Sequence, residues 1–426
     1  MRHPDQLSRI RDGVVGEFVP VVDPPPTRWL SGSIKLDDEQ AAATLIADRD
    51  AYDDKGFPVE CPALAGRTEA GDVLLVAISS RGSNRGHIDV ATYRSKRLLV
   101  NVDLDEVDDD TVTAVQMAYH GLIDWVDNPI YHEDQLVEGE KYVGWTAELR
   151  YGKDTTVDLD GGFTLRFGAG WQIDGPHDRR TFATPLTVTV ESATRRPIGD
   201  HIVRLDAVHA LLNIAHRGQV KSFGGSVQLL DPKQWCGFWE ANMMTTEAAD
   251  QGTHEFPYLG LEAVGGLDGV ANWVRLVLRH RRAVVPLVRH ALFTNQTPES
   301  RLLSTATAME SWVAANRRTA AWAQKVKDED LPYALVRKVD RAWDEWVGEP
   351  DKWVKDFWHA YTCLKHRPDA EPDPHQLHML EVSGRWLLTA ALLDECAGSL
   401  GPSAHLFGKS LSMIGSGVRE SLKEAT

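Results

Sequence analysis

Short apolar runs, separated by Gly, Asp and Asn, follow one another from Trp29 to about Leu165. Among them are WLSGSIKL, VLLVAISS, RLLVNVDL and YVGWTAEL, which are rich in β-branched and aromatic residues. At residues 186–192, LTVTVES alternates apolar and polar positions, as a strand does when one of its faces is in water. These patterns predict a β-rich domain, either a sandwich or a curved sheet.

Apolar residues at helical spacing replace this pattern in the last third of the chain. The clearest case is RLLSTATAMESWVAANRR, from Arg301 to Arg318, where apolar residues recur every three or four positions and share one face of a helix. Thr297 and Pro298 precede it, as the N-cap and first residue of a helix do. Further helical patterns cover about residues 267–293, with an interruption near Pro286, and residues 332–347, 353–366 and 374–398.

Together the two patterns predict an α+β fold, with a β-rich domain at residues 1–260 and an all-α helical bundle at residues 261–426. The length agrees, because 426 residues exceed what one hydrophobic core usually supports. A hydrophobic content of 42% and a charged content of 25% are ordinary for a folded soluble protein. The net charge of -16 argues against broad, non-specific binding of nucleic acid, but it leaves room for a local basic pocket.

The cysteines and the amino terminus bear on the compartment. Cys61, Cys236, Cys363 and Cys396 form no CxxC pair, which fits a reducing compartment and gives no support for a zinc ribbon or a disulfide framework. The first residues lack the apolar core of a signal peptide, and no stretch approaches the roughly 18 apolar residues of a membrane span. We therefore predict a cytoplasmic protein with no membrane partner.

The segment WVKDFWHAYTCLKH, from Trp353 to His366, has an apolar stripe. Phe357, Tyr361 and Leu364 continue the stripe at the spacing that keeps side chains on one face of a helix. On spacing alone, such a stripe is typical of a helix that packs against a core.

The basic end of this segment is the first candidate for chemistry. Pro368 disfavours helical geometry at Arg367, so the helix is expected to end near His366. There the negative end of the helix dipole favours the protonated imidazole, and Lys365 and Arg367 add positive charge. The cluster could hold a phosphate, although a favourable basic helix end explains the same residues.

A second candidate lies at the start of the last long helix. His375 and His378 are three residues apart, and Glu381 follows one turn later, so that all three could bind a divalent metal from one helix face. No fourth ligand is in view, which favours a solvated first turn instead. We predict no metal and no cofactor.

Several segments together resemble ApeA-like bacterial defence proteins. RLLSTATAMESWVAANRR, a charged helix, a helix ending in CLKHRPD and a long terminal helix follow one another as in the HEPN-type helical domain of these proteins. VQMAYHGLIDWVDNP, at residues 115–129, is similar to the aromatic-Gly-Leu-x-x-Trp element of the ApeA N-terminal domain. IVRLDAVHALLNIAHRGQV, at residues 202–220, resembles the closing helix of that domain. The resemblance covers most of the chain in the expected order.

The resemblance implies a metal-independent endoribonuclease of anti-phage defence and abortive infection, which acts as a homodimer of HEPN bundles. In this family an arginine and a histidine, separated by about four residues, act on the RNA backbone. A histidine can move protons, and a guanidinium can stabilise the charge that grows on the phosphate. The implied substrate is RNA, with tRNA as one candidate, and the implied trigger is a phage component.

The family motif is altered in this chain. His366 takes the histidine position, but Tyr361 stands where the arginine is expected, and a tyrosine carries no charge at neutral pH. Three interpretations stay open. Lys365 or Arg367 supplies the missing charge, His359 serves as a second imidazole about two turns before His366, or the bundle has lost catalysis and keeps only binding or dimerisation.

A different class of function would place the site in the β-rich domain. That domain would act as a sensor for a phage protein or a carbohydrate-like ligand, and the bundle would only dimerise. RNA cleavage should depend on His366, whereas a sensor should depend on the regions around Trp125 and Trp235–Trp239.

Overall fold

The structure is a computed structural model of the chain. The residues that it describes are 4–22, 28–37, 39–47, 60–84, 89–104, 111–126, 131–149, 155–169, 172–174, 181–183, 186–218, 220–229, 235–241, 257–292, 296–367 and 372–424.

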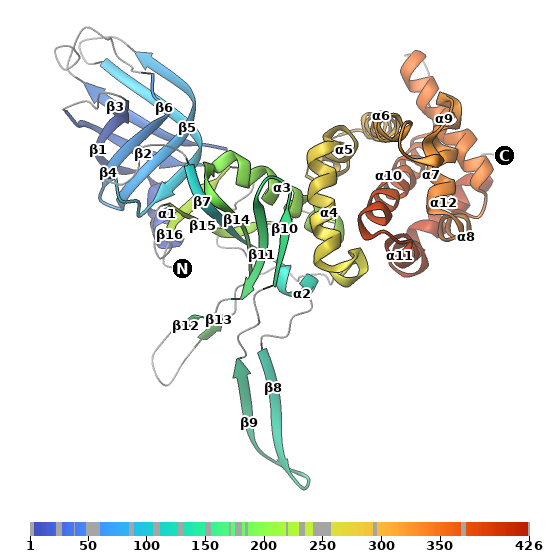
Figure 1. The fold of residues 1–426 in the computed structure, drawn as a ribbon, viewed down its shortest axis with the longest axis horizontal. Coiled ribbons are helices and arrows are strands. Elements are labelled where there is room, and N and C mark those ends of the chain that lie inside the picture. Colours follow the sequence, from blue (N-terminus) through green and yellow to red (C-terminus); the bar gives the residue numbers. More distant parts are fainter. Residues whose placement is uncertain are drawn as a thin grey trace. The chain divides into compact units, whose positions relative to one another are not determined.

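The chain divides into two compact units. The first comprises Met1–Leu122, Pro129–Asp206 and Lys221–His254 and holds the strands. The second comprises Ile123–Asn128, Ala207–Val220 and Glu255–Thr426 and is helical. The predicted α+β fold class, with strands first and helices last, is confirmed (Figure 1).

The first unit contains a closed antiparallel barrel. Its neighbours in order are β6, β3, β2, β1, β4 and β5, and β5 pairs back onto β6 to close the ring. The sequence predicted a sandwich or a curved sheet, and the structure has the curved sheet. Its closure into a barrel depends on the pairing of two long strands, β5 and β6, which no local pattern reveals. The strands are β1 (Val14–Val21), β2 (Leu30–Leu36), β3 (Ala41–Ala47), β4 (Ala63–Thr68), β5 (Gly71–Asn84) and β6 (Asp89–Val100).

The barrel continues into an open sheet because β6 has a divided edge. Residues 89–95 of β6 pair with β3, and residues 97–100 pair with β16 instead, while β5 covers the other edge. From β16 the sheet runs through β15, β7, β14 and β11 to β10. These strands are β7 (Thr111–Tyr119), β10 (Thr155–Leu159), β11 (Phe163–Ala169), β14 (Leu186–Pro197), β15 (Ser222–Gln228) and β16 (Trp235–Glu240). Helix α1 (Pro4–Asp12) precedes β1 in the chain, and helix α3 (Ile198–Ala215) follows β14 and precedes β15.

The alternation of LTVTVES does not mark a solvent face. Thr187 and Thr189 are both buried, although the sequence pattern predicted that they face water. Strand β14 lies between β7 and β11, and Gln116 of β7 donates hydrogen bonds to Thr187 Oγ1 at 2.8 Å and to Thr189 Oγ1 at 3.3 Å. The threonines are therefore buried polar groups with a partner, which the alternation alone cannot distinguish from exposed ones.

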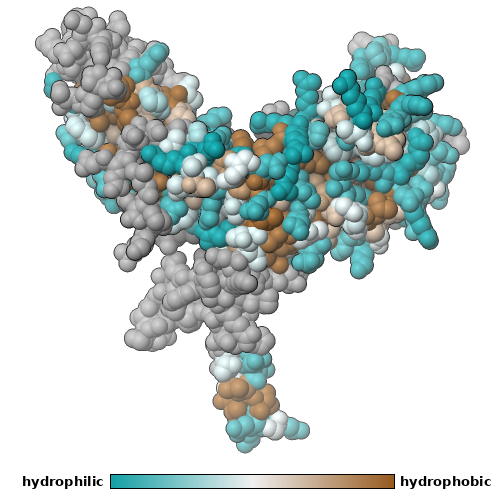
Figure 2. All heavy atoms as spheres, in the orientation of Figure 1, coloured by the Kyte–Doolittle hydropathy of each residue, from teal (hydrophilic) through white to brown (hydrophobic). Residues whose placement is uncertain are grey.

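Two hairpins form sheets of their own, β8 (Tyr131–Glu138) with β9 (Lys141–Leu149) and β12 (Gln172–Asp174) with β13 (Thr181–Ala183). The first hairpin carries an exposed apolar patch, visible as brown atoms in Figure 2. Its residues are Leu136, Val137, Tyr142 and Val143, which are between 46% and 63% exposed. Contiguous exposed apolar side chains of this kind mark interaction surfaces.

The second unit is a helical bundle around α10 (Pro374–Ala397). Apolar residues surround the axis of α10 on every side, as in a helix that is buried all round. The helices that pack on it are α4 (Gly266–Arg279), α6 (Pro298–Asn316), α7 (Leu331–Val339), α9 (Pro350–His366), α11 (Gly401–His405) and α12 (Ser412–Glu424).

Two predicted helices are divided in the structure. The segment predicted as helical at residues 267–293 contains α4 and α5 (Arg281–Leu292), which separate at His280, whereas Pro286 lies inside α5. Residues 332–347 form α7 and α8 (Arg341–Val347), which separate at Asp340, where φ is +62°. Neither His280 nor Asp340 is a typical helix breaker, so sequence reasoning placed one break wrongly and missed the other.

Among the described residues, no helix has the length and apolar character needed to cross a membrane.

The aromatic stripe of α9 belongs to the core, as predicted: Trp353 and Phe357 are fully buried and Tyr361 is 3% exposed. Trp353 Nε1 donates a hydrogen bond to Ser383 Oγ of α10 at 2.8 Å. Helix α9 is thereby fixed against α10.

The close approach of α9 and α10 depends on Gly384. A Cβ atom at this position would lie 2.5 Å from Phe357 Cε2, inside a fully buried ring. We expect Gly384→Ala to lower the free energy of unfolding by roughly 1–3 kcal/mol, because a packed core resists added volume. Chemical denaturation measures the change. Gly408→Ala is the matched control, since a Cβ there meets nothing within 4 Å, and equal stability of the two variants would contradict the packing argument.

Candidate functional site

Tyr361 joins α9 to α6 through a chain of polar groups. Its Oη donates a hydrogen bond to Glu310 Oε1 at 2.8 Å and accepts one from Lys365 Nζ at 2.8 Å. Lys365 Nζ also lies 3.9 Å from Glu310 Oε1. Tyr361 and Lys365 share a helix face because they are four residues apart. A carboxylate, a phenol and an ammonium group therefore form one continuous cluster.

The phenol of Tyr361 is neutral in this cluster. Burial raises the pKa of Tyr361; the hydrogen bond from Lys365 opposes this effect, and the hydrogen bond to Glu310 adds to it. Lys365 Nζ lies 4.9 Å from the centre of the Tyr361 ring, within the range of a cation–π contact. The positive charge beside Tyr361 thus belongs to Lys365, whose side chain remains 47% exposed.

The two histidines of α9 lie on the solvent side of the helix. His359 and His366 are both exposed. They are seven positions apart, which is nearly two helical turns, so they point in similar directions. His359 Nε2 is 3.4 Å from Cys363 Sγ. His366 is the last residue of α9, as predicted, and Arg367 follows as an exposed cap whose backbone N–H donates to Cys363 O at 2.8 Å.

The structure brings together only part of the predicted site. Tyr361 and Lys365 meet, and Glu310 joins them, while no hydrogen bond links His366 to either within the described part of the chain. Glu310 stands at the edge of the apolar stripe of α6, a position that is typical of a carboxylate that is exposed or paired with a nearby cation. No pattern in the sequence indicated that Tyr361 would be its hydrogen-bond partner, because that contact joins residues 51 positions apart.

A second polar cluster surrounds Glu381 on α10. The Glu381 side chain is 0% exposed, so the predicted solvated first turn is wrong for this residue. Its carboxylate lies 3.9 Å from Arg301 Nε of α6, 3.7 Å from Arg385 Nε and 3.9 Å from His378 Nδ1. The two guanidinium groups are close enough to the carboxylate for ion pairs, although these contacts are too long for hydrogen bonds.

The cluster around Glu381 is unsuited to a metal. Arg301 and Arg385 carry permanent positive charge and would repel a divalent cation. Burial lowers the pKa of His378, and the Glu381 carboxylate opposes this effect. Across the part of the chain that the structure describes, no group of three His, Cys, Asp or Glu side chains could hold a metal ion.

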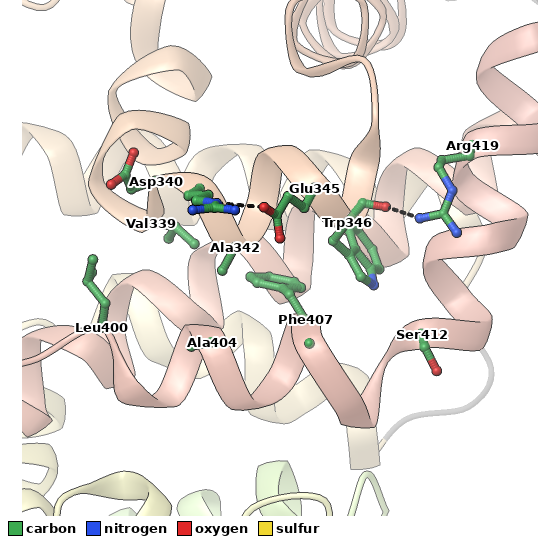
Figure 3. A pocket seen from close by; sticks show the side chains of 12 residues that line it. Val339, Asp340, Ala342, Glu345, Trp346, Leu400, Ala404, Phe407, Ser412 and Arg419 are labelled. Carbon is green, nitrogen blue, oxygen red and sulfur yellow. Dashed lines mark hydrogen bonds and ion pairs between the residues drawn. The ribbon is translucent and has the colours of Figure 1, made fainter.

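A pocket of about 510 Å³ lies elsewhere in the bundle (Figure 3). Trp346 and Phe407 provide its aromatic lining, and Arg419 donates to Trp346 O at 2.5 Å. Arg341 pairs with Glu345 at its rim, with Nε and Oε1 2.6 Å apart. None of the side chains of α9 lines this pocket, so it is separate from the predicted site.

Two of the three tryptophans proposed for a sensor surface, Trp125 and Trp239, are core residues, whereas Trp235 is half-buried. Trp125 is 0% exposed and Trp239 is 1% exposed, and Phe238 beside it is fully buried. Side chains with this burial hold their unit together and are closed to a ligand. The exposed apolar side chains of the first unit include those of the β8–β9 hairpin instead.

The Glu381 cluster predicts a large difference between two glutamate substitutions. Glu381→Gln leaves Arg301 and Arg385 without a countercharge at a buried position, and we expect a loss of roughly 3 kcal/mol in the free energy of unfolding. The matched control is Glu345→Gln, which breaks the exposed pair with Arg341 and should leave unfolding unchanged. Denaturant titration of the two variants makes the comparison. Wild-type stability of Glu381→Gln would show that the cluster does not stabilise the bundle.

The one match to a known family covers most of the first unit and short segments of the second. The family model described as ApeA N-terminal domain 1 matches residues 28–258, which is more than half of the chain. The match begins before β2 and ends before α4, so it includes most of the barrel, the open sheet and α3. No curated protein and no solved structure matches the chain. The chain therefore belongs to the family of proteins that carry ApeA N-terminal domain 1.

Proposed function

We propose that this protein acts in anti-phage defence and that its helical unit is a metal-independent, HEPN-type endoribonuclease. In this proposal residues 1–260 form the sensing domain and residues 261–426 the HEPN bundle, which acts in the cytoplasm as a homodimer. Family membership supports the defence role. The resemblance of the α6 and α9 segments to the HEPN-type domain supports the assignment of the bundle.

One observation carries the catalytic proposal: Lys365 Nζ lies 2.8 Å from the oxygen of Tyr361, the residue at the arginine position of the motif. The cation that the motif lacks at Tyr361 is thereby provided by a neighbour on the same helix face. An ammonium group cannot reproduce the bidentate guanidinium, but it supplies a positive charge that can stabilise a phosphate. The exposure of the Lys365 side chain leaves that charge accessible to RNA.

The proposed reaction is cleavage of RNA by its own 2′-hydroxyl. A base removes the proton from the 2′-oxygen, which forms a bond to phosphorus while the bond from phosphorus to the 5′-oxygen breaks. The leaving oxygen takes up a proton, so the products are a 2′,3′-cyclic phosphate and a 5′-hydroxyl. His366 moves the proton, and Lys365 stabilises the charge on the phosphate oxygens. His359, or His366 of a second copy of the chain, is available as the other proton carrier.

The β8–β9 hairpin is the best-supported place for recognition of a trigger. Its exposed apolar side chains, Leu136, Val137, Tyr142 and Val143, suit contact with the surface of a phage protein. This part of the proposal replaces the sensor surface that the sequence suggested around Trp125.

A catalytically silent HEPN protein is the second candidate. The observation that favours it is the burial of neutral Tyr361, whose hydrogen bond to Glu310 makes the motif position part of the core. Such a protein would act through sensing, binding and dimerisation alone.

RNA cleavage by purified protein, in EDTA, separates these candidates. We expect the wild type to cleave total bacterial RNA or a tRNA pool, and His366→Ala to be slower by a factor of 10² or more, since a positioned general acid or base contributes about that much. His405→Ala is the control, because His405 also ends a helix but lies on α11. Cleavage by His366→Ala at the wild-type rate would refute the role of His366. Absence of cleavage by every variant would favour the silent protein.

A further inference from the structure

Helices α4 to α6 and the turn after them are strongly basic in an acidic chain. Residues 266–327 contain ten lysines and arginines but only three aspartates and glutamates, a net charge of +7, whereas the whole chain has a net charge of -16. This segregation of positive charge creates a local field of the sign that attracts phosphates. It lies on different helices from His366.

Five arginines of this segment are exposed and come from adjoining helix ends. Arg279 ends α4, Arg281 and Arg282 begin α5, and Arg317 and Arg318 follow α6. We call these five residues the arginine surface. Guanidinium groups suit phosphate recognition because their planar forks can donate two hydrogen bonds to one phosphate.

Aromatic contacts fix these helix ends against one another. The ring of His280, between α4 and α5, packs edge-on against Trp312 of α6, with ring centres 5.2 Å apart. Trp312 contacts Trp322 at 6.2 Å, and Lys338 Nζ lies 5.3 Å from the Trp322 ring. Arg317 is only five residues after Trp312, about 7.5 Å along a helix. The α4–α5 junction and the end of α6 therefore present their arginines together.

Helix stability does not account for two of these arginines. Cations are favourable at the C-terminal end of a helix, which explains Arg279, and unfavourable at the N-terminal end. Arg281 and Arg282 stand in the first turn of α5, which has no acidic residue. The first turn of α4 has Asp268 and that of α6 has Glu299, as the helix dipole favours. Among the described carboxylates, none forms an ion pair with Arg281 or Arg282. An external anion would satisfy both.

We propose that the arginine surface binds the phosphate backbone of RNA, at a place distinct from the site of α9. The inference rests on the proposed function for its choice of RNA, and on the charge, exposure and helix-end placement of the arginines for its location. The side chain of Trp322 is half-buried next to this surface. The surface would hold the RNA while His366 and Lys365 act on it.

The test is the binding of a fluorescein-labelled single-stranded RNA, measured by anisotropy at several salt concentrations. All proteins carry His366→Ala as well, so that cleavage cannot alter the probe. We expect Arg281→Gln/Arg282→Gln to weaken binding about tenfold. The slope of log K against log salt should become shallower by about 1.4, which corresponds to two lost phosphate contacts on a single strand. Because binding is measured without cleavage, this test can succeed even where the proposed ribonuclease activity fails.

The matched control is Arg341→Gln/Lys409→Gln, which removes the same charge from exposed residues of α8 and of the π-helix Leu406–Ser410. Normal binding by the control, with weak binding by the α5 variant, supports the proposal. Equal weakening of both variants would overturn it, because only net charge would then matter. Absence of RNA binding by the parent protein would also overturn it. So would an α5 variant that binds RNA normally but no longer binds phosphatidylserine vesicles.

Discussion

The burial of α10 is the constraint on which the helical unit depends. A helix that is covered on every side can carry a charge only where other helices compensate it, and Glu381 is such a charge. The carboxylate attracts Arg301 from α6 and Arg385 from its own helix. On α10, Ser383 accepts a hydrogen bond from Trp353 of α9, and the missing side chain of Gly384 lets α9 pack closely. The positions of α6 and α9, and therefore the meeting of Glu310 with Tyr361, follow from packing on α10.

In the proposed function, His366 is the histidine of the HEPN motif, and Lys365 supplies the charge that the arginine of the motif would carry. Tyr361 occupies the core side of α9, where it donates a hydrogen bond to Glu310 and accepts one from Lys365. Lys365 stands one turn later, and its side chain is 47% exposed. In the proposed function, chemistry at α9 therefore needs the tyrosine as an anchor for the lysine. The arginine surface would supply RNA affinity from other helices, which lets a protein of net charge -16 bind a polyanion locally.

The sequence predicted features that depend on local pattern. It predicted strands before helices, the buried stripe of Trp353, Phe357 and Tyr361, and the end of α9 at His366, because spacing and proline determine these. It failed where distant residues decide the outcome. Closure of the barrel needs β5 to pair with β6 along its length, and the burial of Glu381 needs an arginine from another helix. No local rule contains either contact.

The most direct measurement asks whether Tyr361→Arg restores the RNA cleavage that Lys365→Gln removes. Lys365→Gln should lower the cleavage rate in EDTA by a factor of 10² or more, as expected for loss of a group that stabilises charge on the phosphate. Lys355→Gln, at another exposed lysine of α9, should leave the rate unchanged. Adding Tyr361→Arg to Lys365→Gln should restore cleavage, because it returns a cation to the motif position. Wild-type cleavage by Lys365→Gln would contradict the assignment of the catalytic charge to this residue.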